Sequence, residues 1–152
     1  MRATTPPDPY TYGLQALSRR ELTSAQLRER LRRRGCDPDA IEAAVTRLQR
    51  ERVLDDTRAA RAFARTEIAI KRRGPERIRR AMDAMGVDRE VAREALEEGF
   101  SERPVDEVLE AALSRKLRGR LLDEKHEQRL IAYLVRQGFG VSASVAAVRR
   151  RR

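Results

Sequence analysis

The apolar residues of this chain recur with helical spacing, and the same pattern occurs three times. Each copy is anchored on a glycine, at Gly35, Gly86 and Gly138. Apolar residues stand eight and four positions before each glycine, then one, nine and ten positions after it. In chain order they are Leu27, Leu31, Cys36, Ala44, Val45; Ile78, Met82, Val87, Ala95, Leu96; and Leu130, Leu134, Phe139, Ala147, Val148. Matches on both sides of each glycine indicate a tandem repeat.

Each copy predicts two helices joined by a tight turn. Apolar residues four positions apart lie on one face of a helix. A glycine just past the last helical turn can adopt the left-handed conformation of a C-cap. Pro38 fits the first position of the helix after Gly35. Side chains that can cap helix N-termini stand at the expected starts: Thr23, Asp37, Asp88 and Asp123. In the third copy Gly140 stands at the cap position, and Ser142, two residues later, is the candidate cap.

A further amphipathic helix is predicted before each pair, at residues 11–19, 56–71 and 105–117. Its apolar positions are Leu14 and Leu17; Ala60, Phe63, Ala64 and Ile68; and Val105, Leu109, Ala112 and Leu113. No segment alternates with the two-residue period of a strand. We therefore predict an all-α fold of nine helices, in three tandem three-helix repeats with an elongated, curved arrangement.

Proline, glycine and charge suggest the boundaries of the repeats. We assign residues 10–54, 55–99 and 100–148 to the three repeats. Residues 1–9 contain three prolines and are expected to form a mobile arm, and residues 149–152 a frayed basic tail. The sequence GFSERP at residues 99–104 is the expected soft joint between repeats two and three. Gly74 and Pro75 separate the first two helices of repeat two.

The charge favours a polyanionic or acidic partner. The net charge is +10, and it is +4 over residues 1–52, +1 over residues 53–100 and +5 over residues 101–152. Arginine outnumbers lysine 31 to 3, a skew that genome base composition can also produce. Charge alone therefore leaves both a nucleic-acid-binding surface and an ordinary solvated surface open.

The residue inventory argues against a catalytic, metal or cofactor site. The single cysteine, Cys36, occupies an apolar repeat position, and the single histidine, His126, stands in a charged helix start. We interpret Cys36 as a core residue and His126 as solvated. Asp55 or Asp56 is better placed to cap a helix than to bind metal. The chain has no apolar run long enough to span a bilayer and no signal sequence, so we expect a cytoplasmic protein without a membrane partner.

Basic residues gather on two helices and on the turn before the second. We define the cationic rim as six arginines that lie beside or away from the apolar stripes of the two helices, together with the three basic residues immediately before Gly74. They are Arg28, Arg32, Arg33, Arg77, Arg79 and Arg80, and Lys71, Arg72 and Arg73. The rim could contact phosphates or acidic side chains, and the tail would add affinity by counterion release. Glu29, Glu76 and Asp83 are interleaved with the rim, so a solvated face with ion pairs is the alternative.

A motif in the middle of the chain points to a family. Residues 53–82 carry Leu54, Asp55, Asp56, Arg58, Ala60, Phe63, Arg65, Gly74, Pro75 and Ile78. This set resembles the signature region of RecX, a family of bacterial regulators of the recombinase RecA. Residues 17–35 and 125–139 resemble the opening and closing segments of the family, so the resemblance covers about residues 10–148. Two positions depart from it: Ala59 replaces a bulky aromatic residue, and Gln137 replaces a basic one.

The resemblance implies a helical modulator with no active site. Such a protein binds RecA and its DNA filament and inhibits ATP hydrolysis, filament growth and strand exchange, within homologous recombination, DNA repair and the SOS response. It also implies single- and double-stranded DNA as partners without sequence specificity, and we expect a monomer. The alternative is a general DNA- or RNA-binding helical protein with no RecA partner. Base reading by a helix-turn-helix is disfavoured, because Asp37 and Asp39 open the helix that would meet phosphates.

Overall fold

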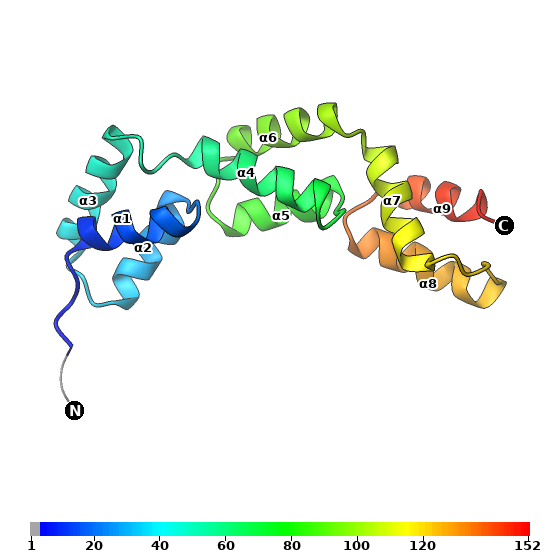
Figure 1. Ribbon diagram of the computed structural model, residues 1–152, viewed down its shortest axis with the longest axis horizontal. Coiled ribbons are helices and arrows are strands. Elements are labelled where there is room, and N and C mark those ends of the chain that lie inside the picture. Colours follow the sequence, from blue (N-terminus) through cyan, green and yellow to red (C-terminus); the bar gives the residue numbers. More distant parts are fainter. Residues whose placement is uncertain (1–3) are drawn as a thin grey trace.

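The computed structural model describes residues 4–152, which form nine α-helices and no strand (Figure 1). Helices of each consecutive triplet pack together, and the three units follow one another in an arched row with the chain ends far apart. The all-α fold of tandem three-helix repeats is therefore confirmed. The helices are α1 (Pro9–Arg19), α2 (Ser24–Arg33), α3 (Pro38–Arg50), α4 (Asp56–Ala69), α5 (Pro75–Ala84), α6 (Arg89–Glu102), α7 (Val105–Leu117), α8 (Glu124–Arg136) and α9 (Val141–Arg149).

The three repeat glycines end α2, α5 and α8 in the same way. Gly35, Gly86 and Gly138 have φ angles of 80°, 76° and 104°, a region that glycine enters without steric penalty. The amide after each glycine donates to a carbonyl five residues earlier, for example Phe139 N to Leu134 O at 3.2 Å. This is the Schellman motif, in which the apolar residue after glycine packs back on the helix. The predicted left-handed caps are confirmed.

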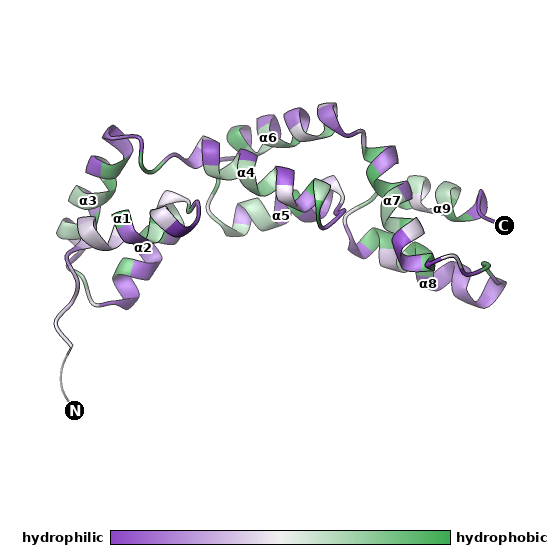
Figure 2. Cartoon of the chain, in the orientation of Figure 1, coloured by the Kyte–Doolittle hydropathy of each residue, from purple (hydrophilic) through white to green (hydrophobic). Residues whose placement is uncertain are grey.

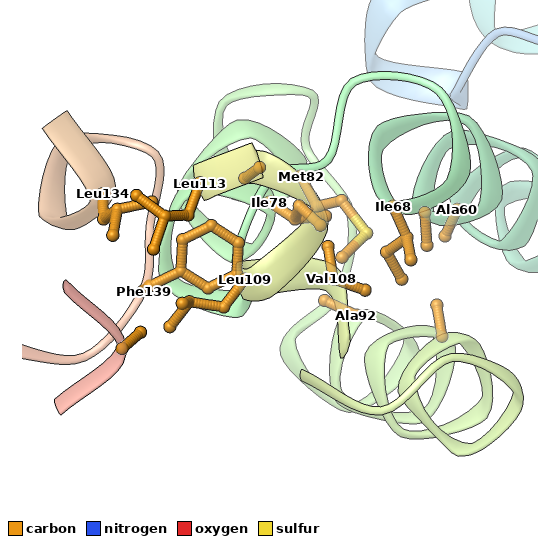
Figure 3. Close-up of a cluster of buried hydrophobic side chains, with 14 of the residues drawn as sticks. Ala60, Ile68, Ile78, Met82, Ala92, Val108, Leu109, Leu113, Leu134 and Phe139 are labelled. Atoms are coloured by element: carbon orange, nitrogen blue, oxygen red, sulfur yellow. The ribbon is translucent and has the colours of Figure 1, made fainter. Parts of the chain in front are cut away.

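Hydrophobic and hydrophilic positions alternate along the helices (Figure 2). The buried apolar side chains form two cores. Unit one has its own, which includes Leu27, Leu31 and Cys36. Units two and three share a continuous one, in which Val108 and Leu109 of α7 lie among side chains of α5, α6 and the turn after α8 (Figure 3). Because burial of apolar surface crosses the joint between units two and three, these two units stabilise each other.

Equivalent positions form a hydrogen bond between neighbouring units at both joints. Thr23 and Gly74 each stand twelve positions before a repeat glycine and cap α2 and α5. The Thr23 hydroxyl donates to Met85 O at 2.6 Å. At the next joint, Gly74 N donates to Gln137 O at 2.8 Å. Thus the start of the second helix in one unit contacts the glycine turn of the next unit.

The beginning of the chain differs from expectation. α1 begins at Pro9, two residues early, because the Asp8 carboxylate accepts from Thr11 N at 2.9 Å and caps the helix. Leu14 is predicted to lie on the apolar face of this helix, but it is 36% exposed and lies outside the core. Gly13 faces α3 instead, where an added Cβ would lie 2.5 Å from Leu48 Cδ1. Residues 1–3 of the expected arm lie outside the described residues.

The joint between units two and three is shorter than expected. α6 continues through Gly99 to Glu102, so most of the GFSERP segment is helical. Gly99 lies against α4, where an added Cβ would be 2.7 Å from Ile68 Cδ1. Arg103 then leaves the helix immediately before Pro104, a position that proline biases towards extended backbone. α4 also ends two residues early, at Ala69.

The candidate N-caps are confirmed at four sites and wrong at the fifth. Thr23, Asp37, Asp88 and Asp123 each accept from a backbone amide of the first helical turn. In unit three, α9 begins at Val141, so Ser142 lies inside the helix and Gly140 is an N-cap without a side chain.

Replacing Gly140 with aspartate is expected to raise the free energy of unfolding by about 1 kcal/mol. Gly140 already has the backbone angles of Asp37, and an added Cβ would meet nothing within 4 Å. The carboxylate would accept from the first amides of α9 and interact favourably with the helix dipole. Urea unfolding followed by circular dichroism measures the gain. Gly140→Ala, which provides no acceptor, should gain less; an equal gain would contradict the capping argument.

Candidate functional site

The end of α4 approaches α7 and α8 (Figure 1). The side chains there line an open, basic cleft. It has a volume of about 600 Å³. Its lining contains six cationic side chains, two other polar side chains and no carboxylate. We call it the basic cleft; it is lined by Lys71, Arg73, Arg115, Lys116, Arg118, Arg120, Tyr133 and Gln137.

Left-handed backbone turns supply the residues on both walls of the basic cleft. After α4, Arg72 has a φ of 51°, and Arg73 N donates to Glu67 O at 3.0 Å. After α7, Arg118 and Gly119 have φ angles of 49° and 74°. Arginine enters this region at a steric cost that glycine avoids. The two helices therefore stop abruptly at the cleft. Lys71 and Arg73 from the turn after α4, and basic residues from the last turn of α7 and the loop after it, lie on its walls.

The only buried carboxylate beside the basic cleft belongs to Glu67, among the residues that the structure describes. Its side chain is 1% exposed, and it pairs with Lys71 Nζ at 3.0 Å and with Arg73 Nη1 at 2.6 Å. On the other wall, Arg115 donates to the Ile70 carbonyl at 3.4 Å, and Lys116 Nζ lies 4.6 Å from the ring centre of Tyr133. The cations of the cleft therefore outnumber its negative charge, which favours an anionic ligand.

The unit-one part of the cationic rim is bound in ion pairs. Arg28 pairs with Glu42 at 2.8 Å. Arg32 and Arg33 share Glu29, at 2.7 and 2.9 Å. Hydrogen bonds from Arg32 and then Arg33 lower the pKa of the Glu29 carboxyl to about 2. All these groups are exposed, so a ligand phosphate could displace the carboxylates at small energetic cost.

The unit-two part of the rim divides between the basic cleft and α5. Lys71 and Arg73 line the cleft, and Arg77 donates to Gln137 Oε1 at 3.2 Å. On α5, Arg79 pairs with Glu76 at 3.0 Å and lowers the pKa of that carboxyl. Arg80 donates to the Glu76 carbonyl at 3.4 Å, and Arg72 is half-buried in the turn. Of the nine rim residues, the structure therefore places two in the cleft.

Motif residues at the start of α4 hold unit one against unit two. Asp55 caps α4 by accepting from Arg58 N at 3.0 Å. Asp56 accepts from the amide and the hydroxyl of Ser24, each at 2.7 Å. Arg58 pairs with Glu21 at 2.6 Å and donates to two backbone carbonyls before α4. These groups orient one unit on the next.

The other motif residues have packing roles or remain exposed. Leu54 is buried in the core of unit one, and Phe63 is half-buried against the shared core. Arg65 is exposed on α4. Gly74 caps α5, and Pro75 is its first residue. The interpretations of Cys36 as buried and of His126 as exposed, in contact with Asp123, are confirmed.

The basic tail is paired with acidic side chains rather than frayed. Arg149 and Arg152 contact Glu127 at 3.8 and 2.6 Å. Arg150 and Arg151 contact Glu110 at 2.9 and 3.1 Å. Burial acts to raise the pKa of Glu110, but hydrogen bonds from Arg150 and Arg151 outweigh it, so this pKa is lowered. The tail thus joins α9 to α7 and α8.

The α7 wall of the basic cleft was missed by the sequence argument. Residues 115–120 read RKLRGR, with four basic residues and no acid. That run was the available signal, but it lies outside the repeat positions and outside the family motif. Tyr133 had no signal, because only the fold brings α8 beside the end of α7. Within residues 4–152, no helix is both long and apolar enough to cross a membrane.

Comparisons with known proteins agree with the repeat and the motif. The family models for the first and second three-helix domains of RecX match residues 10–48 and 55–96. The regulatory protein RecX of Thermotoga maritima is 34% identical over 134 residues, covering 88% of this chain and 78% of that protein. The regulatory protein RecX of Thermus thermophilus is 35% identical and covers 91% of this chain and 88% of its own length.

A solved structure agrees at the level of fold. RecX from Lactobacillus salivarius superposes with a TM-score of 0.77 at 19% identity, with 93% of each chain covered. The relatives and the solved structure match beyond the first two three-helix domains, into unit three. This chain therefore belongs to the RecX family of regulatory proteins.

Proposed function

We propose that this chain is a negative regulator of RecA, which binds RecA and its DNA filament and inhibits ATP hydrolysis, filament growth and strand exchange. The observation that carries the proposal is the match to regulatory RecX proteins over about nine-tenths of the chain. In this role the protein acts in the cytoplasm, as a monomer and without a cofactor, and its contacts are those of a binding protein rather than an enzyme.

In this proposal the cationic rim is the contact surface, and it binds DNA phosphates and acidic side chains of RecA together. Seven rim residues lie outside the basic cleft, on α2, on α5 and in the turn after α4: Arg28, Arg32, Arg33, Arg72, Arg77, Arg79 and Arg80. Exchange of an exposed intramolecular carboxylate for a phosphate is favourable when counterions are released. DNA of either strandedness would be bound without sequence specificity, because phosphate contacts carry no sequence information.

The protein is expected to inhibit RecA ATP hydrolysis on single-stranded DNA at amounts well below one molecule per RecA. A modulator that acts on filament growth needs few copies, whereas a protein that competes for DNA must coat it. Titration at two DNA concentrations separates the two cases. Inhibition unchanged by extra DNA supports the proposal. Inhibition relieved in proportion to added DNA would favour the alternative, a general nucleic-acid-binding protein.

A further inference from the structure

We propose that the basic cleft binds the backbone of a single nucleic-acid strand, which passes between units two and three. The inference rests on the proposed function, because it names the nucleic-acid contact of that function. It concerns a place that the sequence motif does not mark, since four of its six cations come from α7 and the loop after it.

The arrangement of charge favours phosphates as the ligand. Lys71 and Arg73 come from the turn after α4, and Arg115 and Lys116 come from the last turn of α7. A ligand between these walls is contacted from both sides. Glu67 neutralises part of the first wall. The four cations of the α7 wall are exposed side chains that line the opening, although Arg115 also donates to the Ile70 carbonyl and Lys116 lies over the Tyr133 ring.

The shape of the basic cleft favours a single strand over a duplex. Proteins that bind single strands combine a basic groove, which tracks the backbone, with an aromatic side chain on which a base can stack. Tyr133, which is half-buried, provides the aromatic group in this cleft. A duplex carries its phosphates on a convex outer surface, so it can touch the edge of a cleft but cannot enter it.

An acidic protein segment is the competing occupant. It would use the same cations but would have no base to place beside Tyr133. Six cations with an aromatic side chain, in a cleft open to solvent, match the single-strand pattern more closely. Both occupants can be compared directly in solution.

The test compares two charge-matched double variants of the full chain. Lys116→Gln/Arg120→Gln removes two exposed cations from the basic cleft. Arg19→Gln/Arg20→Gln removes two exposed cations at the end of α1 in unit one, outside the cleft. Circular dichroism checks that both variants keep their helices. Binding of a fluorescein-labelled oligothymidylate is measured by anisotropy over a range of salt concentrations.

The cleft variant should bind the oligonucleotide more weakly, with a salt slope smaller in magnitude by about 1.4, because each phosphate contact to a single strand contributes about 0.7. The control variant should retain the slope of the parent protein. An equal loss in both variants would overturn the proposal, since binding would then follow net charge. Stronger cleft-dependent binding of a duplex or of polyaspartate would also overturn it.

The RecA assay separates this inference from the proposed function. If the parent protein inhibits RecA and the cleft variant binds the oligonucleotide normally, the cleft assignment alone fails. If the parent protein does not inhibit RecA but binds the strand through the cleft, the proposed function alone fails.

Discussion

Replacing Gly138 with alanine is expected to lower the free energy of unfolding by about 3 kcal/mol. Gly138 has a φ of 104°, which strains any residue with a Cβ. Its Cβ would also lie 2.5 Å from Arg77 N, a backbone atom that cannot move alone. Both effects act at the joint between units two and three.

The joint has little room to relax. Gly74 N donates to Gln137 O at 2.8 Å, and Glu76 N donates to Gly138 O at 3.2 Å. An alanine that pushes the turn away from α5 would lengthen both hydrogen bonds. Phe139, directly after the glycine, would move with the turn, although it is 2% exposed in the shared core. The strain would therefore reach the packing that units two and three have in common.

Gly119→Ala is the matched control for this prediction. Gly119 also has a positive φ, 74°, but an added Cβ would meet nothing within 4 Å. The Gly119→Ala variant should lose only about 1 kcal/mol of its free energy of unfolding, which is the cost of the left-handed backbone conformation for alanine. Urea unfolding by circular dichroism compares the two variants. Equal losses would show that the close approach of the two units contributes no stability.

The sequence predicts the helices and caps within each unit, but it does not predict the contacts between units. The spacing of Leu31, Met82 and Leu134 before the three glycines defines helices and caps, because local periodicity and capping carry that information. The same glycine turns are also docking surfaces, but this role depends on which unit lies beside them. Asp56 illustrates the difference: it was a candidate cap by position, and it bonds Ser24 of the neighbouring unit instead.

Charged residues were the hardest to place from the sequence. Ion pairs within one helix follow from helical spacing: Arg79 pairs with Glu76, three positions earlier, as the interleaved acids indicate. Ion pairs between helices do not follow from it. The sequence predicts a frayed tail, because residues at a chain end are poorly ordered unless something holds them. Glu110 on α7 and Glu127 on α8 hold the tail, and they lie 39 and 22 residues before Arg149. Pairing over such distances depends on the fold.

Glu67→Gln is expected to lower the free energy of unfolding by about 2 kcal/mol and to raise the affinity for a single strand. The buried carboxylate holds Lys71 and Arg73 on one wall of the basic cleft. Removing one partner of a buried ion pair costs about 3 kcal/mol or more, and the partial exposure of both cations reduces this loss. The side chain keeps its size, so packing of α4 is preserved.

The affinity should rise because, among residues 4–152, Glu67 is the only carboxylate paired with cations of the basic cleft, and the variant removes its charge. One unit charge about 7 Å from a phosphate in water changes the binding constant about threefold at low salt. Anisotropy with the labelled oligothymidylate measures this gain, and urea unfolding measures the loss of stability. A lower stability together with a higher affinity is informative, because a variant that is only partly unfolded would bind the strand more weakly.

Glu98→Gln provides the matched control for Glu67→Gln. Glu98 pairs with Arg61 at 2.8 Å on the surface, and its side chain is 49% exposed. The variant has the same change in net charge, but an exposed pair contributes less than about 1 kcal/mol. It should therefore leave stability nearly unchanged and raise the affinity less than Glu67→Gln does. If both variants raise the affinity equally, the strand responds to the charge of the whole chain and not to the field of the cleft.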